Sequence, residues 1–189
     1  MEVRIKAAPR LPGFNATDKD LERMIRVDHA GEFGAVQIYR GQLAVLDRIA
    51  VRSHAARIIA EMEAGEAEHL KTFDRLIAER GVRPTVMAPL WRVAGFGLGA
   101  VTALMGERAA HACTEAVEEV IEDHYGRQSE QLGRQDPELK DVIDRFREDE
   151  IGHKQTAIEQ GAREAPGYAV LSAVIKLGCR AAIRISERI

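Results

Sequence analysis

The stretch RVDHAGEFGAVQIYRGQ, residues 26–42, places an acid inside a run whose apolar residues recur at helical spacing. Ile25, Tyr39 and Leu46 stand seven residues before, seven after and fourteen after Glu32, so the four side chains share one face of a helix. A lone buried carboxylate is costly. Glu32 is therefore expected to be neutral, paired with a cation or bound to a metal.

The composition indicates a single helical domain. The chain has 189 residues, of which 46% are hydrophobic and 30% charged, and its formal net charge is -3. This length suits one domain with a full core, and strand signals between hairpin turns are lacking, so we predict an all-α fold. The charge gives no reason to expect nucleic acid as a partner. Two distant cysteines, Cys113 and Cys179, are expected to be core thiols in a reducing compartment.

Capping residues and glycines divide the chain into helices. Thr17 is the expected cap of a helix that runs from about Asp18 to about Ala50. Asp136 and Pro137 suit the first positions of a later helix. The remaining helices are expected at about 54–81, 107–132, 136–161 and beyond 166.

Two further helices carry the same unusual feature as the first. Glu66 and His69, in GEAEHL, lie on the apolar face of the second helix, and Glu150 and His153, in DEIGH, lie on the apolar face of the fourth. The pattern Glu-x-x-His thus occurs twice, each time directed toward the core.

The third helix offers two neighbouring acids, and periodicity decides between them. Glu118 stands over Tyr125 on the apolar stripe, whereas Glu119 shares its face with Glu115 and Glu122. Glu118 is therefore the acid expected to point into the core.

The spacing of these residues predicts a bundle built from two copies of one unit. Glu32 precedes Glu66 by 34 residues, and Glu118 precedes Glu150 by 32. Residues of an antiparallel helical hairpin lie at the same height when the turn falls midway between them, which here means near residues 49 and 134, where turn signals occur. We expect one domain with an internal repeat, at about 18–81 and 107–161.

Four carboxylates and two imidazoles in a bundle core form the ligand set of ferritin-like dimetal-carboxylate proteins. The expected metal ligands are Glu32, Glu66, His69, Glu118, Glu150 and His153. Four carboxylates balance two divalent ions, and oxygen-rich ligands favour iron or manganese without excluding zinc. The alternative is a metal-free network of acids and histidines inside a structural bundle.

Several neighbours of these ligands could orient them or move protons. Asp28 is one turn before Glu32, Tyr125 is two turns after Glu118, and His124 lies on the flank of both; each could instead be a hydrogen-bonded core residue. Gly31 and Gly34, beside Glu32, leave room for a substrate or for a closely packed helix. His54 and His111 are expected to be surface or packing residues.

Two apolar segments, at about 85–106 and 166–189, suggest contact with a membrane surface. The second carries a basic edge opposite an apolar stripe, as in interfacial helices. The first has a proline, an arginine and four glycines, which makes it a poor spanning helix. The alternative is that both segments only pack on the bundle. The basic edge comprises Lys176, Arg180, Arg184 and Arg188, and the stripe comprises Val170, Val174, Leu177, Ala181 and Ile185.

Six motifs between residue 20 and residue 189 carry a family resemblance: RVDHAGEFGA, EAEHLKTFD, GVRPTVMAPLW, ACTEAVEEVIEDHY, EDEIGH and APGYAVLSAVIKLGCRAAIRISERI. With these motifs the chain resembles the demethoxyubiquinone hydroxylases of ubiquinone biosynthesis. The resemblance implies a ferritin-like antiparallel four-helix bundle with additional apolar and amphipathic helices. It implies that the six expected ligands hold two iron ions per chain, and that His124 and Tyr125 lie near the irons.

By the same resemblance, the expected activity is a di-iron monooxygenase that uses O2 to hydroxylate the ring of a polyprenylated demethoxyubiquinol. The alternative is an iron-oxidising ferritin or a rubrerythrin-like peroxidase. The expected partners are the benzoquinol, a membrane surface and other ubiquinone-biosynthesis proteins. The N-terminal stretch resembles neither a secretory signal nor a transit peptide. The expected location is therefore the cytoplasmic face of a bacterial inner membrane, or alternatively the matrix side of the mitochondrial inner membrane.

Overall fold

A computed structural model describes residues 18–49, 53–133 and 135–189, and within these ranges the chain is helical and contains no strand. The predicted all-α fold is confirmed. Thr17, Ala50 and the predicted turn positions 50–52 and 134 lie outside the described residues. The helices are α1 (Asp18–Ile49), α2 (His54–Arg80), α3 (Ala88–Leu104), α4 (Glu107–Leu132), α5 (Pro137–Glu159), the short 3-10 helix η1 (Ala162–Glu164) and α6 (Tyr168–Ser186).

The helix ends follow from local chemistry. The hydroxyl of Ser53 accepts a hydrogen bond from the backbone of Ala56 at the start of α2, and α2 ends at Gly81, which adopts a left-handed conformation with φ of 64°. Asp136 caps α5 by accepting from the backbone N–H of Leu139 at 3.0 Å, with proline at the first helical position. These boundaries agree with the sequence predictions.

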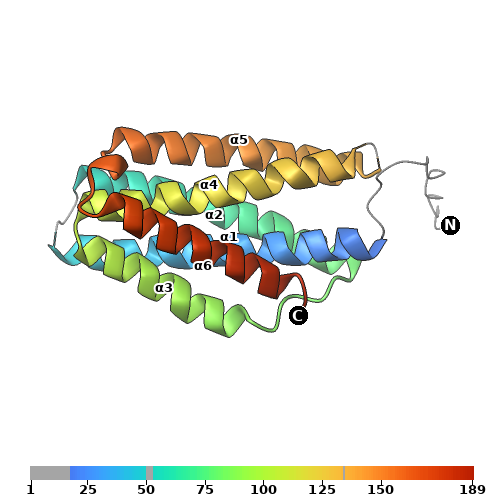
Figure 1. The fold of residues 1–189 in the computed structure, drawn as a ribbon. Coiled ribbons are helices and arrows are strands. Elements are labelled where there is room, and N and C mark those ends of the chain that lie inside the picture. The colour runs from blue at the N-terminus through green and yellow to red at the C-terminus, as the bar shows by residue number, and fades with distance from the viewer. Residues whose placement is uncertain (1–17, 50–52, 134) are drawn as a thin grey trace.

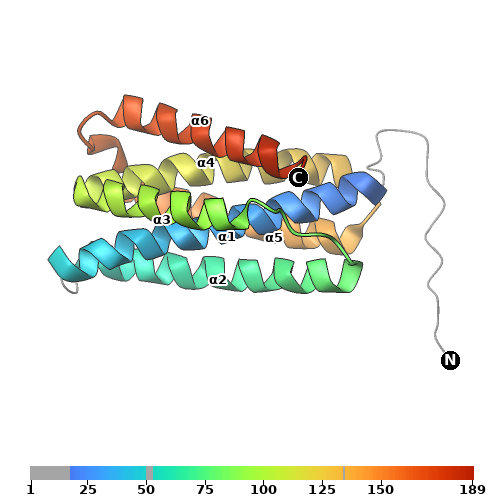
Figure 2. The same cartoon turned by 90° about the horizontal axis from the view of Figure 1, so that it is seen from below.

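Helices α1, α2, α4 and α5 form a four-helix bundle (Figures 1 and 2). Two apolar clusters fill it. One cluster contains Ile25, Phe73 and Leu139, and the other contains Leu46 and Ile59. The faces that the sequence periodicity assigned to the core are therefore the buried ones.

Helix α3 lies along α1, and α6 lies along α4 (Figure 2). The crossing of α1 and α3 is close because Gly41 and Gly99 lack side chains: a Cβ on Gly41 would lie 2.1 Å from the carbonyl oxygen of Phe96, and one on Gly99 would lie 1.9 Å from that of Ile38. The indole of Trp91 donates to Ser186 at 3.1 Å and joins α3 to α6. These two helices therefore form an additional layer on one side of the bundle.

The packing of η1 and α6 on α4 corrects two sequence expectations. Glu115, grouped with the outward acids, is fully buried because η1 covers that face of α4, and it accepts a hydrogen bond from Arg163 at 2.8 Å. Lys176, assigned to the exposed basic edge of α6, instead lies 2.7 Å from Glu119 of α4. Core periodicity alone did not reveal a second buried face on α4.

The outer faces of α3 and α6 expose large apolar side chains. The exposed residues include Val93, Phe96, Val101 and Leu104 of α3 and Val170, Val174, Leu177 and Ile185 of α6. Neither segment is therefore fully covered by packing on the bundle. No helix within the described ranges is both long and apolar enough to cross a membrane.

Candidate metal centre

The six ligands expected from the sequence converge in the middle of the bundle, each from the helix that was predicted to carry it. Two groups of ligand atoms each lie within 4.8 Å of one another. The groups share Glu66 and Glu150, one from α2 and one from α5, and each adds a glutamate and a histidine of its own. The groups are Glu32, Glu66, His69 and Glu150, and Glu66, Glu118, Glu150 and His153.

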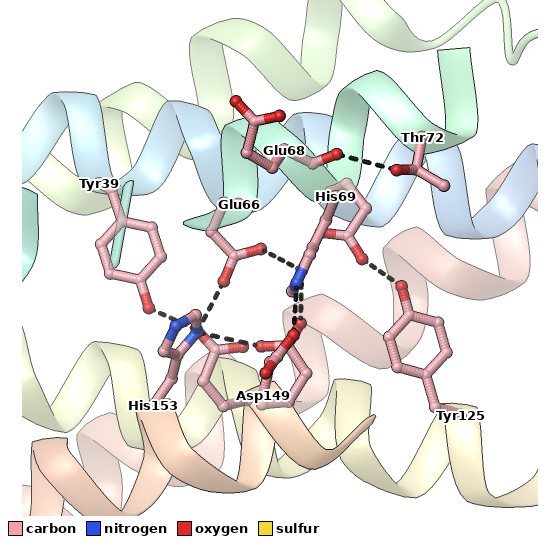
Figure 3. A network of polar contacts seen from close by, with 11 residues as sticks. Tyr39, Glu66, Glu68, His69, Thr72, Tyr125, Asp149 and His153 are labelled. Atoms are coloured by element: carbon pink, nitrogen blue, oxygen red, sulfur yellow. Dashed lines mark hydrogen bonds and ion pairs between the residues drawn. The ribbon is translucent and has the colours of Figure 1, made fainter. Parts of the chain in front are cut away.

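The histidine nitrogens face the carboxylates that they would share a metal with (Figure 3). Nδ1 of His69 lies 3.6 Å from Glu32 Oε2 and 3.3 Å from Glu150 Oε1. Nδ1 of His153 lies 3.0 Å from Glu66 Oε1 and 3.4 Å from Glu150 Oε2. Because Glu66 and Glu150 belong to both groups, the six residues could hold two metal ions and share these two carboxylates between them.

The hydrogen bonding of these atoms tests whether they fit a metal pair. Each ligand residue keeps at least one buried oxygen or nitrogen without a hydrogen-bond partner, and Glu66 and Glu150 keep both carboxylate oxygens free. Buried polar atoms are normally paired, so atoms that converge without partners call for a cation. Oxygen donors with one imidazole nitrogen per position fit iron or manganese.

Burial and mutual repulsion alter the proton affinity of the centre. Burial and, as the next cause, the charge of Glu66 raise the pKa of Glu32 to about 7. Burial also raises the pKa of Glu118 well above its usual value, with Glu150 as the next cause. Burial acts to lower the pKa of His153, but the nearby carboxylates of Glu150 and Glu66 raise it to about 11. Without metal the centre therefore holds protons, which a bound cation would displace.

Two tyrosines hold the outer glutamates. The hydroxyl of Tyr125 donates to Glu32, and that of Tyr39 donates to Glu118 at 2.6 Å. An interval of 86 residues separates both Glu32 from Glu118 and Tyr39 from Tyr125. The internal repeat thus extends to these cross-helix hydrogen bonds. Tyr125 was singled out from sequence; Tyr39 was not, although the repeat interval could have identified it.

Asp28 and His124, both expected near the candidate ligands, lie beside each other in the structure. His124 Nε2 lies 3.3 Å from Asp28 Oδ1, and the Gln128 amide donates to the same oxygen at 2.8 Å. Burial raises the pKa of Asp28, although its hydrogen bond with His124 acts to lower it. Gln128, which sequence reasoning missed, also lies 2.9 Å from His124 and links the three side chains. His124 and Gln128 line a small polar pocket with Arg23 and Arg127, and Asp28 lies buried behind them.

An apolar cavity of about 420 Å³ lies between α1, α3, α4 and α6. Gly31 and Gly34, the glycines that flank Glu32, line it, and a Cβ on either would meet no atom within 4 Å. Two roles were considered for Gly31 and Gly34, and the structure supports the one that leaves room for a molecule. The residues that allow close packing of α1 and α3 are instead Gly41 and Gly99.

Cys179 also lines the cavity, and Cys113 is buried. His54 is exposed and His111 is buried, as a surface and a packing residue respectively.

The chain is similar in sequence to proteins of one known family. A family model described as ubiquinone biosynthesis protein COQ7 matches residues 19–186. The 3-demethoxyubiquinol 3-hydroxylase of Rhodospirillum rubrum is 50% identical over 186 residues, which cover 98% of this chain and 86% of that protein. The NADPH-dependent 3-demethoxyubiquinone 3-hydroxylase, mitochondrial, of Homo sapiens is 48% identical over 179 residues, covering 93% and 81%. The 5-demethoxyubiquinone hydroxylase, mitochondrial, of Saccharomyces cerevisiae is 41% identical over 184 residues, covering 89% and 78%. The chain belongs to the COQ7 family of ubiquinone biosynthesis proteins.

Proposed function

We propose that this protein is a di-iron monooxygenase that hydroxylates the ring of a polyprenylated demethoxyubiquinol with O2. The observation that carries the proposal is the position of the apolar cavity: two glycines of its wall flank Glu32, a residue of the candidate metal centre. The relatives are named as hydroxylases of demethoxyubiquinol or demethoxyubiquinone. A hydrophobic quinol ring in this cavity would lie beside the candidate metal centre.

The six residues would hold two iron ions, and Glu66 and Glu150, which belong to both groups of ligand atoms, would contribute to both positions. When bound, a ferrous pair supplies electrons to O2 and so makes oxygen insertion into a ring C–H possible. The protein's own contribution is to hold and orient. The phenols of Tyr125 and Tyr39 donate hydrogen bonds to Glu32 and Glu118 and so hold these carboxylates in place.

The cavity walls would bind the substrate and exclude water. Its lining is almost wholly apolar, contributed by side chains such as Ile38, Val117, Ile121 and Ile175. An apolar wall favours the quinol ring and tail and keeps bulk water away from the reacting carbon. Trp91, which also lines the cavity, ties α3 to α6 at its edge.

Access from a bilayer is part of the proposal. The exposed apolar faces of α3 and α6, with Arg180 and Arg184 exposed beside them, would lie in the interface of a membrane and deliver the substrate to the cavity between these helices. Peripheral attachment needs no spanning helix. The eukaryotic relatives are named mitochondrial, which agrees with the second of the two expected locations. Protein partners in ubiquinone biosynthesis stay a prediction.

The experiment is anaerobic loading with ferrous iron, followed by O2 and a short-chain demethoxyquinol, with the product identified by mass spectrometry. Some relatives are named NADPH-dependent, so NADPH is the reductant to supply. We expect two irons per chain and a product that gains one oxygen atom from labelled O2. Iron that oxidises without product would instead support the storage or peroxidase alternative. Failure to bind iron would refute the proposal.

A further inference from the structure

The two halves of the candidate metal centre follow the internal repeat, but they differ at one position. An interval of 84 residues takes Glu66 to Glu150 and His69 to His153. The same interval takes Gly65 to Asp149, so the residue before the bridging glutamate is a glycine on α2 and an aspartate on α5.

Asp149 fixes the histidine of the opposite helix. Its Oδ2 lies 3.1 Å from Nε2 of His69 (Figure 3). The imidazole of His69 also stacks on Phe146, with ring centroids 3.8 Å apart. With Nε2–H donated to Asp149, the lone pair of Nδ1 points toward Glu32 and Glu150. A carboxylate on the outer nitrogen orients a ligand histidine, sets its tautomer and makes it a better metal donor.

His153 has no such support. Among the described residues, no side chain hydrogen bonds to its Nε2, and its side chain is 18% exposed against 6% for His69. The position equivalent to Asp149 is Gly65, where a Cβ would lie 3.5 Å from Nε2 of His153. Both halves therefore have a residue position next to the outer nitrogen of the histidine, but only the position on α5 carries a carboxylate, that of Asp149.

We propose that the two metal positions are unequal, and that the one formed by Glu32, Glu66, His69 and Glu150 takes its ion first because Asp149 positions His69. The inference rests on the dimetal site of the proposed function. Loss of such an outer partner typically weakens metal binding about 10-fold to 100-fold. The first ion is therefore held more tightly than the second by a factor of that order.

The test is an anaerobic titration of the metal-free protein with Mn2+, followed by electron paramagnetic resonance and calorimetry. We expect the wild-type protein to show the spectrum of an isolated ion at one Mn2+ per chain, and that of a coupled pair at two. Asp149→Ala should weaken the first step about 10-fold to 100-fold and bring the two steps together. Asp149→Glu should restore much of the separation. Asp149 is about half exposed, so these changes leave the core intact.

Two further variants separate positioning from bulk charge. Glu148→Ala removes the same charge from the neighbouring exposed position and should leave both steps unchanged. Gly65→Asp places a carboxylate beside His153 and should tighten the second step. Equal binding of both ions by the wild-type protein, or equal effects of Asp149→Ala and Glu148→Ala, would overturn the inference and leave the dimetal site standing. A protein that binds no metal would remove both the inference and the proposed function.

Discussion

His111 should make the fold sensitive to mild acid. It is 1% exposed on α4, and neither ring nitrogen has a hydrogen-bond partner. Burial lowers its pKa from 6.5 to about 4; Glu107 acts to raise it, and His54 acts to lower it. The unfolded chain binds more protons than the folded one between these values, so stability falls as the pH falls from about 6.5 to about 4. The cost is about 2 kcal/mol between pH 7 and pH 5 and about 3 kcal/mol in full.

The perturbation that removes this effect is His111→Leu. Urea unfolding of the metal-free wild-type and variant proteins at pH 7, 6 and 5 gives two free-energy curves. Because all other groups titrate in both proteins, their contributions cancel in the difference between the curves. We expect the wild-type protein to lose about 2 kcal/mol more than the variant between pH 7 and pH 5. Curves that run parallel over this range would show that His111 does not stay neutral in the fold.

Two further predictions concern the cavity and the outer face. Gly34→Leu fills part of the cavity and should weaken quinol binding by about 1–3 kcal/mol, roughly tenfold to hundredfold, while its higher helix propensity keeps the unfolding midpoint from falling. The measurements are KM and the midpoint of thermal unfolding, and Gly34→Ala, which adds only a methyl group, is the control. An unchanged KM for Gly34→Leu would show that the substrate binds elsewhere. Replacing Arg180 and Arg184 by glutamine should lower affinity for anionic vesicles by about 2 kcal/mol, or roughly 30-fold, with little change on neutral vesicles. Co-sedimentation measures both, and equal losses on the two surfaces would contradict an electrostatic role.

Much of the fold was predictable because helix signals are local. Ser53 and Asp136 each cap a helix through a hydrogen bond with the residue three positions later, and Pro137 follows Asp136 at the first helical position. Such short-range signals can be recognised directly in the sequence. The inward direction of Glu118 followed from a single period of 3.6 residues, since one face of a bundle helix is buried. The same reasoning was wrong for Glu115, because η1 covers a second face of α4. The hydrogen bond from Arg163 of η1 to Glu115 joins residues 48 positions apart, which helical periodicity does not reveal.

The sequence by itself determined the helices, the 84- to 86-residue intervals and the six converging candidate ligands, since each depends on spacing within a helix or across one turn. Only the tertiary structure decided which partners complete the centre. Asp149 reaches His69 across 80 residues and Tyr39 reaches Glu118 across 79, and no periodicity encodes the angle at which two helices meet. The cavity likewise exists because α3 and α6 enclose the glycine face of α1, and a packing void depends on how side chains from four helices fit together.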